Sequence, residues 1–137
     1  MVEETIQEVL AFFAIKAEVL DKDFSLHRRI PKEYNGIYVL TQGNDVIYVG
    51  KGQIRKRQTT HWNKAFKNVN EGLDDPKGWR WLRENINIDP ITWKVCYILL
   101  NKQTELSAVE GALIHKLQPL ANDETFKDNG RILKETK

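Results

Sequence analysis

The stretch YNGIYVLTQGNDVIYVGKG, residues 34–52, carries the clearest structural pattern in the sequence, and we expect it to form the centre of the fold. Residues 34–40 and 46–49 are rich in β-branched and aromatic side chains, which favour strands. The Gln42-Gly43-Asn44-Asp45 segment between them has the composition of a tight turn. We therefore expect a β-hairpin here, which Gly50-Lys51-Gly52 brings to an end.

Helical spacing of apolar residues follows the hairpin in two places. A first helix is expected over about residues 53–69, from the positions of Ile54, His61, Trp62, Ala65, Phe66 and Val69. A later helix is expected over residues 104–117 and is ended by Pro119; its apolar stripe is Leu106, Val109, Leu113, Ile114 and Leu117. Between these helices we expect a polar loop, a short helix at 79–84 and a buried central strand at 91–100.

Residues before the hairpin predict an N-terminal extension. Thr5 and Glu8 make a capping box, and Ile6, Val9, Leu10, Phe13, Ala17 and Leu20 recur at helical spacing. We therefore expect an amphipathic helix over about residues 5–21 and a connector over 21–31. The expected organisation is an extension, residues 1–31, and a main domain, residues 32–137.

Composition narrows the class of protein. The chain has 137 residues, 41% hydrophobic and 29% charged, which is typical of one globular domain and excludes collagen-like or wholly disordered chains. Cys96 is the only cysteine, so a disulfide framework and a cysteine-rich zinc site are excluded, and we expect a cytoplasmic location. The longest apolar runs are too short for a bilayer and the N-terminus is acidic, so we expect no membrane partner and no export signal.

Charge is unevenly distributed along the chain. Residues 1–25 carry six acidic side chains against two lysines, whereas residues 27–67 carry nine basic side chains against two acidic ones. A basic block of this size can bind phosphates, although a solvated helix face has the same composition. The acidic N-terminal helix is a poor candidate for touching DNA, so we expect it to pack on the main domain or on another subunit.

Three residues on the expected helices do not fit a purely structural domain. Glu110 lies on the edge of an apolar stripe, where a carboxylate needs a cation, hydrogen bonds or a metal ion, so it is either a structural salt-bridge partner or a metal ligand. Arg57 and His61 are four residues apart and share a helix face, from which both can reach one phosphate. An exposed arginine beside a core histidine would look the same.

Two tyrosines, Tyr38 and Tyr48, lie one on each expected strand of the hairpin. Tyrosines in strands usually serve packing. A free phenol has a pKa near 10, so a tyrosine that acts as a base at neutral pH needs a nearby cation, such as Lys51, or a metal ion.

Taken together, these residues form an ordered pattern. Gly36-Ile37-Tyr38 is followed after nine residues by Tyr48-Val49-Gly50-Lys51, and then by Arg57, His61, Glu110 and Asn122. This pattern resembles the GIY-YIG nuclease superfamily, which includes homing endonucleases, some restriction enzymes and the incision domain of a bacterial excision-repair protein. The resemblance covers about residues 33–123, and the run from Val109 to Pro119 looks like the third helix of that family.

Two departures from the family pattern are visible. Val49 stands where the name-giving form has isoleucine, which is a mild change. The interval from Tyr48 to Arg57 is one residue shorter than usual, so Arg55 competes for the phosphate-facing role. We prefer Arg57 because it shares a helix face with His61.

The resemblance implies a fold and a chemistry. The implied fold is α/β (α+β): a small three-stranded, mainly antiparallel sheet flanked by helices. The implied activity is metal-dependent phosphodiester hydrolysis, with Glu110 as ligand of Mg²⁺, for which Mn²⁺ can substitute. Tyr38 would position or deprotonate the attacking water, with Tyr48 and Lys51 lowering its pKa.

Further roles are implied for the remaining residues of the pattern. Arg57 would hold the phosphate oxygens and His61 would orient or relay a proton. Gly36 and Gly50 would permit close backbone approach at the edge of the site, and Asn122 would fix local geometry through its amide. The candidate nucleic-acid-binding residues are Lys51, Arg55, Lys56, Arg57 and Lys64.

The expected substrate is DNA, with RNA still open. The chain has no recognisable zinc finger, helix-turn-helix or second basic domain, so we expect structure-selective or weakly sequence-specific cleavage, in DNA repair or in restriction. Trp79 and Trp81 can either stack on unpaired bases or pack in the core. Two other classes stay open: a catalytically silent nucleic-acid-binding module, and a scaffold that forms a homo-oligomer through the N-terminal helix.

Overall fold

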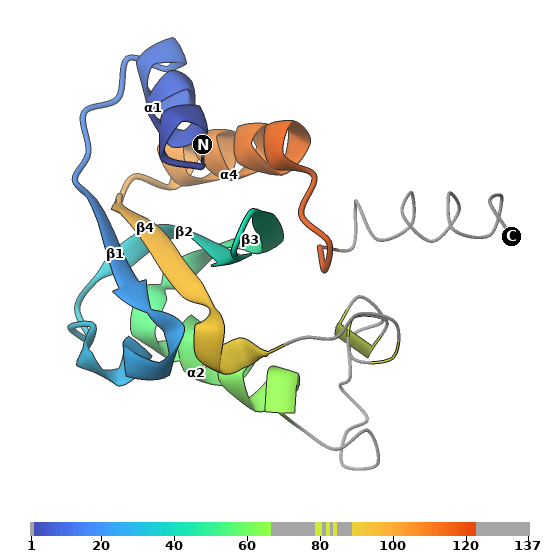
Figure 1. Cartoon of the computed structure of the whole chain (residues 1–137). Coiled ribbons are helices and arrows are strands. Elements are labelled where there is room, and N and C mark those ends of the chain that lie inside the picture. Colours follow the sequence, from blue (N-terminus) through green and yellow to red (C-terminus); the bar gives the residue numbers. More distant parts are fainter. Residues whose placement is uncertain (1, 67–78, 81, 83, 85–88, 123–137) are drawn as a thin grey trace, which may run out of the picture.

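The structure is a computed structural model that describes residues 2–66, 79, 80, 82, 84 and 89–122 (Figure 1). Its elements follow the chain in this order: α1 (Val2–Phe12), β1 (Val19–Asp23), the 3₁₀ helix η1 (Phe24–Arg29), β2 (Asn35–Gln42), β3 (Asp45–Gln53), α2 (Ile54–Phe66), the 3₁₀ helix η3 (Pro90–Thr92), β4 (Lys94–Leu99) and α4 (Gln103–Leu117).

The strands form one antiparallel sheet in the order β1-β4-β2-β3. Tyr38 of β2 lies at its centre, paired with Gly50 of β3 on one side and with Tyr97 of β4 on the other. The expected mixed α+β class with a mainly antiparallel sheet is confirmed. The described part of the sheet has four strands, however, where three were expected.

The additional strand, β1, comes from the segment that we expected to be the end of a helix and a connector. Helix α1 ends at Phe12, because Ala14 takes a left-handed conformation with φ of 56° and Ile15 N–H donates to the carbonyl of Leu10. Val19–Asp23 then pairs with β4. The helical spacing of residues 17 and 20 was misleading, because a strand edge elsewhere in the fold offered these residues hydrogen-bond partners.

The expected connector at 21–31 is therefore also wrong in its second half. Residues Phe24–Arg29 form η1, which is anchored by the buried side chains of Phe24 and His27. His27 Nδ1 lies 2.9 Å from the carbonyl oxygen of Phe24, and its Nε2 lies 3.1 Å from Thr59 Oγ1 of α2. This contact fastens η1 to α2.

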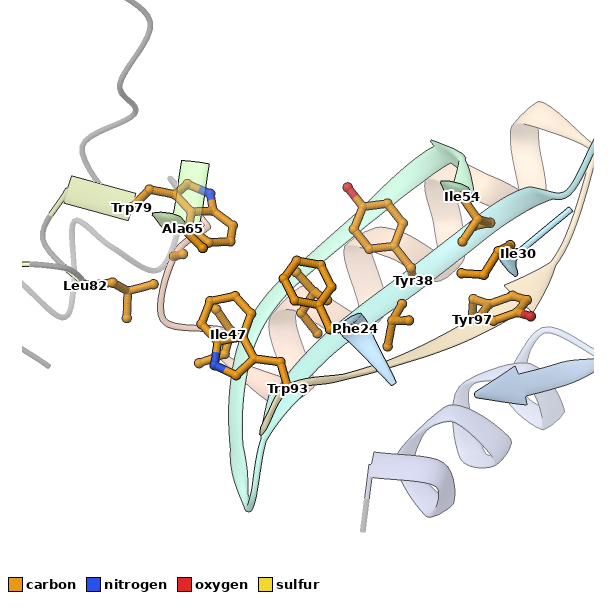
Figure 2. Close-up of a cluster of buried hydrophobic side chains, with 13 residues drawn as sticks. Phe24, Ile30, Tyr38, Ile47, Ile54, Ala65, Trp79, Leu82, Trp93 and Tyr97 are labelled. Atoms are coloured by element: carbon orange, nitrogen blue, oxygen red, sulfur yellow. The ribbon is translucent and has the colours of Figure 1, made fainter. Parts of the chain in front are cut away.

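Two apolar clusters cover the two faces of the sheet. On one face α1 and α4 pack on Ile37, Val39 and Ile98, and the two helices lie together in Figure 1. On the other face lie α2, η1 and a cluster rich in aromatic side chains (Figure 2), whose largest members are Phe24, Tyr38, Trp79, Trp93 and Tyr97. The sheet is thus buried on both sides, and β3 forms one of its edges.

Strand β3 is longer than expected. Gly50-Lys51-Gly52 does not end the strand: Gly50 pairs with Tyr38 and Gly52 with Gly36, so pairing continues to Gln53. The glycines are compatible with the ladder because Gly52 can adopt its φ of 130° without steric cost. A bulge at Ile47, where Leu40 pairs with Tyr48 and Thr41 with Val46, brings Ile47 and Tyr48 to the aromatic face.

Most of the remaining expectations hold. The helices expected at 53–69 and 104–117 correspond to α2 and α4, and α4 ends where Gln118 turns left-handed before Pro119. The described residues of 79–84 are helical, and the strand expected at 91–100 is shortened to β4 because Pro90–Thr92 forms η3. The loop expected at 70–78 lies outside the described residues. Among the described helices, none has both the length and the apolar character needed to cross a bilayer.

Candidate active site

A buried hydrogen bond joins β2 to α2 at the centre of the candidate site. Tyr38 Oη lies 2.7 Å from His61 Nε2, and the two side chains are only 2% and 3% exposed. Tyr38 reaches this position from β2, an inner strand of the sheet, and His61 from the buried stripe of α2. Two of the residues expected to share one site therefore touch.

Glycines make room for this contact. A Cβ at Gly50 would collide with the Tyr38 hydroxyl, so any other residue at position 50 would displace the phenol. Gly52 has the same function for an arginine, because its ideal Cβ would lie 3.0 Å from Arg57 Nε. Gly50 thus allows the Tyr38 side chain to approach the β3 backbone closely, in agreement with the role expected for this glycine.

Gly36 allows a close approach within the sheet. A Cβ at this position would collide with the carbonyl of Ile98, in the ladder between β2 and β4. Its close approach is therefore to the neighbouring strand inside the sheet. Across the other ladder Gly36 pairs with Gly52, which lies against Arg57, so the close approach expected for Gly36 is present and its place at the edge of the active site stays a prediction.

Aromatic rings enclose the His61 imidazole. Trp79 stacks on it with ring centroids 5.2 Å apart and an interplanar angle of 15°, and the Tyr48 ring centroid lies 4.6 Å away. Trp79 is 1% exposed, so in this structure it packs in the core and is not presented to bases. Trp81 lies outside the described residues.

Burial controls the ionisation of the pair. It raises the pKa of Tyr38 well above its ordinary value, and Tyr48 and Glu110 raise it further while Arg57 lowers it. Burial, with Lys64 and Arg57, lowers the pKa of His61 to about 3. Both groups are therefore neutral at neutral pH. The expectation that Tyr48 lowers the Tyr38 pKa is wrong, because a second phenol brings no positive charge.

Glu110 and Lys51 meet at the other side of the β3 edge. Lys51 Nζ lies 3.7 Å from Glu110 Oε1 and donates a hydrogen bond to Ser107 Oγ at 3.0 Å. The Lys51 and Glu110 side chains are 35% and 23% exposed, so the carboxylate lies at the boundary of the core and partly in solvent. The pairing satisfies the salt-bridge interpretation of Glu110.

Asn122 fixes the backbone next to the site. Its amide accepts from Val49 N–H and donates to Val49 C=O, both at 2.8 Å, as a paired strand would. The preceding residues Leu120 and Ala121 donate to Val46 and Ile47. This segment therefore covers the β3 edge up to Val49, and Gly50 follows immediately. The geometric role expected for Asn122 agrees with these contacts.

The structure separates the two competing arginines. Arg57 is exposed, lies against Gly52 and affects the pKa of both Tyr38 and His61. Arg55 instead lowers the pKa of His27, which places its charge toward η1. Lys56 is exposed and Lys64 is half-buried near His61. Arg57 is thus the arginine that lies with the candidate site.

One buried polar residue of α2 was not expected. Gln58 is 0% exposed and lies in a stripe of buried side chains, Ile54, Gln58, His61 and Ala65. Their spacing of four, three and four residues was visible in the sequence. Glutamine does not count as apolar in such a pattern, so the position of Gln58 between Ile54 and His61 was the one feature of the sequence that indicated its burial.

The donor chemistry of Glu110 fits a hard divalent cation. Among the described residues no three His, Cys, Asp or Glu side chains form a group able to hold a metal. A single, partly exposed carboxylate is nonetheless suited to Mg²⁺, which keeps several waters and takes further oxygens from a bound phosphate. Glu110 can hold such an ion without a second protein ligand.

Comparisons of the chain with protein-family models, with curated proteins and with solved structures give no match. The functional argument therefore rests on the residues of the site and their geometry.

Proposed function

We propose that this chain is a divalent-metal-dependent endonuclease of the GIY-YIG type that hydrolyses phosphodiester bonds in DNA. The observation that carries the proposal is the hydrogen bond between Tyr38 Oη and His61 Nε2, with the Arg57 guanidinium beside it. The Lys51–Glu110 pair follows at the same strand edge. A proton-transfer pair, a phosphate-binding cation and an oxygen ligand are the parts that this hydrolysis needs.

In the proposed reaction Arg57, Tyr38 and His61 have different roles. Arg57 binds the non-bridging phosphate oxygens as a bidentate donor. Tyr38 orients the attacking water and accepts its proton, while its own proton passes to His61 Nε2. The phosphate anion opposes the field of Arg57 and Lys64, which raises the His61 pKa and prepares the imidazole to accept that proton.

Glu110 is the proposed ligand of Mg²⁺, with Mn²⁺ as a substitute. When bound, the ion supplies a Lewis acid that neutralises charge on the leaving oxygen. Lys51 keeps the carboxylate in place through its contacts with Glu110 and Ser107. Because Glu110 is the one ligand proposed among the described residues, we expect the ion to bind tightly only together with the nucleic acid.

The proposed substrate is DNA cut with structural or weak sequence selectivity, and RNA is the alternative that the test includes. Exposed Arg57 and Lys56, with half-buried Lys64, provide positive charge on α2, and Lys51 lies on the α4 side of β3. Cys96 is the single cysteine, so the proposal includes a reducing, cytoplasmic location.

Oligomer formation through α1 has lost its main support. Its apolar residues Ile6, Val9 and Leu10 are buried against the sheet and α4 of the same chain. We therefore do not extend the proposal to a homo-oligomer or to a scaffold that works through α1.

The test is incubation of the purified chain with supercoiled plasmid, branched DNA and single-stranded RNA, each with Mg²⁺, with Mn²⁺ and with EDTA. We expect metal-dependent nicking of DNA that EDTA abolishes. A folded chain that binds these substrates but cuts none of them would overturn the endonuclease and favour the second candidate, a silent binding module. That candidate is favoured by one observation, the small exposed fraction of Tyr38.

A further inference from the structure

Three polar atoms are buried on one face of α2 with no hydrogen-bond partner among the described residues. They are Oε1 and Nε2 of Gln58 and Nδ1 of His61. A buried polar atom without a partner costs about 1–3 kcal/mol, so these atoms need an explanation, and Gln58 Oε1 and His61 Nδ1 can share one.

Helix geometry places the Gln58 and His61 side chains next to each other on one face of α2. Gln58 and His61 are three residues apart in α2, which brings their Cβ atoms to about 5–6 Å. Ile54 and Ala65 continue the same buried stripe on either side. The His61 ring is stacked by Trp79 and held at Nε2 by Tyr38, so its orientation is fixed and Nδ1 is the nitrogen nearer the helix backbone.

The tautomer of His61 depends on which group donates the proton in its hydrogen bond with Tyr38. Tyr38 and His61 are both neutral at neutral pH, so the hydrogen bond between them holds one proton. If the Tyr38 hydroxyl donates to Nε2, the imidazole proton is on Nδ1 and requires an acceptor. The buried amide oxygen of Gln58 is an acceptor on the same helix face.

We propose that Gln58 is a positioning residue whose amide oxygen accepts the Nδ1–H of His61, across one buried water, and holds Nε2 open to the proton of Tyr38. A bridging water would accept from Nδ1–H and donate to Oε1, as buried waters do between polar groups. The catalytic consequence rests on the proposed nuclease function, whereas the tautomer does not.

The consequence for hydrolysis follows from the proton balance. As the water oxygen attacks phosphorus and the bond to the leaving oxygen breaks, one water proton moves to Tyr38 Oη. The Tyr38 proton moves to His61 Nε2, which makes an imidazolium whose Nδ1–H bond toward Gln58 strengthens. His61 later returns its proton through Tyr38 to solvent or to the leaving oxygen. A His61 that carries its proton on Nε2 cannot begin this sequence.

The direct test is ¹⁵N NMR of the histidine rings near neutral pH, with the His61 signals identified by their loss in His61→Gln. We expect Nδ1 of His61 to carry the proton in the wild-type chain. Gln58→Met, which keeps the volume and removes the acceptor, should move the proton to Nε2. Gln58→Glu keeps an acceptor oxygen and should retain the wild-type tautomer. Asn63→Met, at an exposed position of α2, is the matched control and should change nothing.

Cleavage supplies the second readout. Gln58→Met should lower kcat roughly 10–100-fold with little change in KM, as loss of an orienting partner does, and Gln58→Glu should restore most of it. An Nε2–H tautomer of His61 in the wild-type chain would overturn the inference, and the wild-type NMR spectrum alone shows this. An unchanged tautomer in Gln58→Met would also overturn it. A chain with the expected tautomers but no cleavage would support the inference and contradict the nuclease proposal instead.

Discussion

Tyr38 and His61 share one proton at neutral pH, because burial raises the pKa of the phenol and lowers that of the imidazole to about 3. Neither group is a strong base or acid by itself. Their 2.7 Å contact matters because it lets a proton leave Tyr38 without creating an isolated buried phenolate. In the proposed nuclease reaction, the Arg57 charge next to the pair would make that transfer respond to a bound phosphate.

Tyr38→Phe tests this pair. The substitution leaves His61 Nε2 buried without its partner, so we expect about 1–3 kcal/mol of lost stability and a loss of cleavage. Tyr97→Phe is the matched control, since Tyr97 pairs with Tyr38 across the sheet and is also buried. Cleavage rates and urea denaturation of both variants check the prediction. Equal cleavage by Tyr38→Phe and Tyr97→Phe would exclude Tyr38 from the chemistry.

Arg57→Gln and Arg55→Gln test which arginine binds the phosphate. Arg57 lies against Gly52 and affects both Tyr38 and His61, whereas the Arg55 charge acts on His27. Losing one donor to developing charge costs about 10²–10³-fold in rate, so we expect this loss for Arg57→Gln only. Single-turnover cleavage measures it. A larger loss for Arg55→Gln would reverse the assignment.

Spacing in the sequence placed Arg57 and His61 on one helix face, and the family resemblance added Tyr38 and Asn122 to the same site. The hydrogen bond between Tyr38 and His61 was not predicted. Residue types and spacing were insufficient for Gln58, because an amide carries no apolar signal and no charge. For Gly36 the resemblance predicted a close backbone approach without indicating that the approaching backbone is that of Ile98 in β4.

Helix α2 is the element that carries most of the site. Its buried stripe contains Gln58 and His61 between two apolar residues. Next to this stripe, the Thr59 hydroxyl contacts His27 of η1. A helix that buries polar groups depends on their protonation more than an apolar helix does. The stability of its docking should therefore depend on pH.

The direction of that dependence follows from the lowered His61 pKa. The unfolded chain binds a proton near the ordinary value of 6.5, whereas folded His61 binds one only near 3. Below pH 6.5 the unfolded chain therefore binds a proton that folded His61 does not. The folded state has its full stability above pH 6.5 and loses stability as the pH falls from 6.5 toward 3. Burial also lowers the His27 pKa, which adds to the loss.

As the pH falls through this range, we expect His61 to lower the free energy of unfolding by about 1.4 kcal/mol per pH unit. Urea denaturation at a series of pH values measures the slope. His61→Gln should lower the slope by about one proton, whereas His115→Gln, at an exposed position, should leave it unchanged. A His61→Gln chain with the wild-type slope would contradict the lowered pKa.

At the scale of elements, the sequence predicted α2, α4 and the hairpin because each has a strong local periodicity. It failed for β1 and for the end of β3. Val19–Asp23 is a strand only because β4 lies beside it, and Gly50-Lys51-Gly52 continues a strand because Gly36 and Tyr38 lie opposite. Both depend on partners distant in sequence, which local propensity does not contain.

In the whole molecule, the sheet separates an apolar layer made with α1 and α4 from an aromatic layer made with α2 and η1. The candidate site joins the two layers at the β3 edge, with Tyr38 and His61 on the α2 side and Lys51 and Glu110 on the α4 side. The site is therefore assembled only when both layers are packed on the sheet.

Ile6→Ala tests whether α1 belongs to the same cooperative unit. Ile6 is 0% exposed, so truncation should cost about 2–5 kcal/mol, while Gln7→Ala, at an exposed position, should stay within about 0.5 kcal/mol. Tryptophan fluorescence reports the opposite layer, where Trp79 and Trp93 lie. If Ile6→Ala leaves the fluorescence-detected denaturation midpoint unchanged, α1 is a separate appendage.

The most direct measurement compares cleavage of supercoiled DNA by the wild-type chain, Glu110→Gln and Glu105→Gln, in Mg²⁺ and in EDTA, with DNA affinity measured on the same preparations. Glu105 lies in the first turn of α4 and is the matched carboxylate away from Lys51. The account predicts that Glu110→Gln loses cleavage by about 10²–10³-fold and keeps DNA affinity, while Glu105→Gln cuts like wild type. Cleavage by Glu110→Gln near the wild-type rate would contradict the central claim.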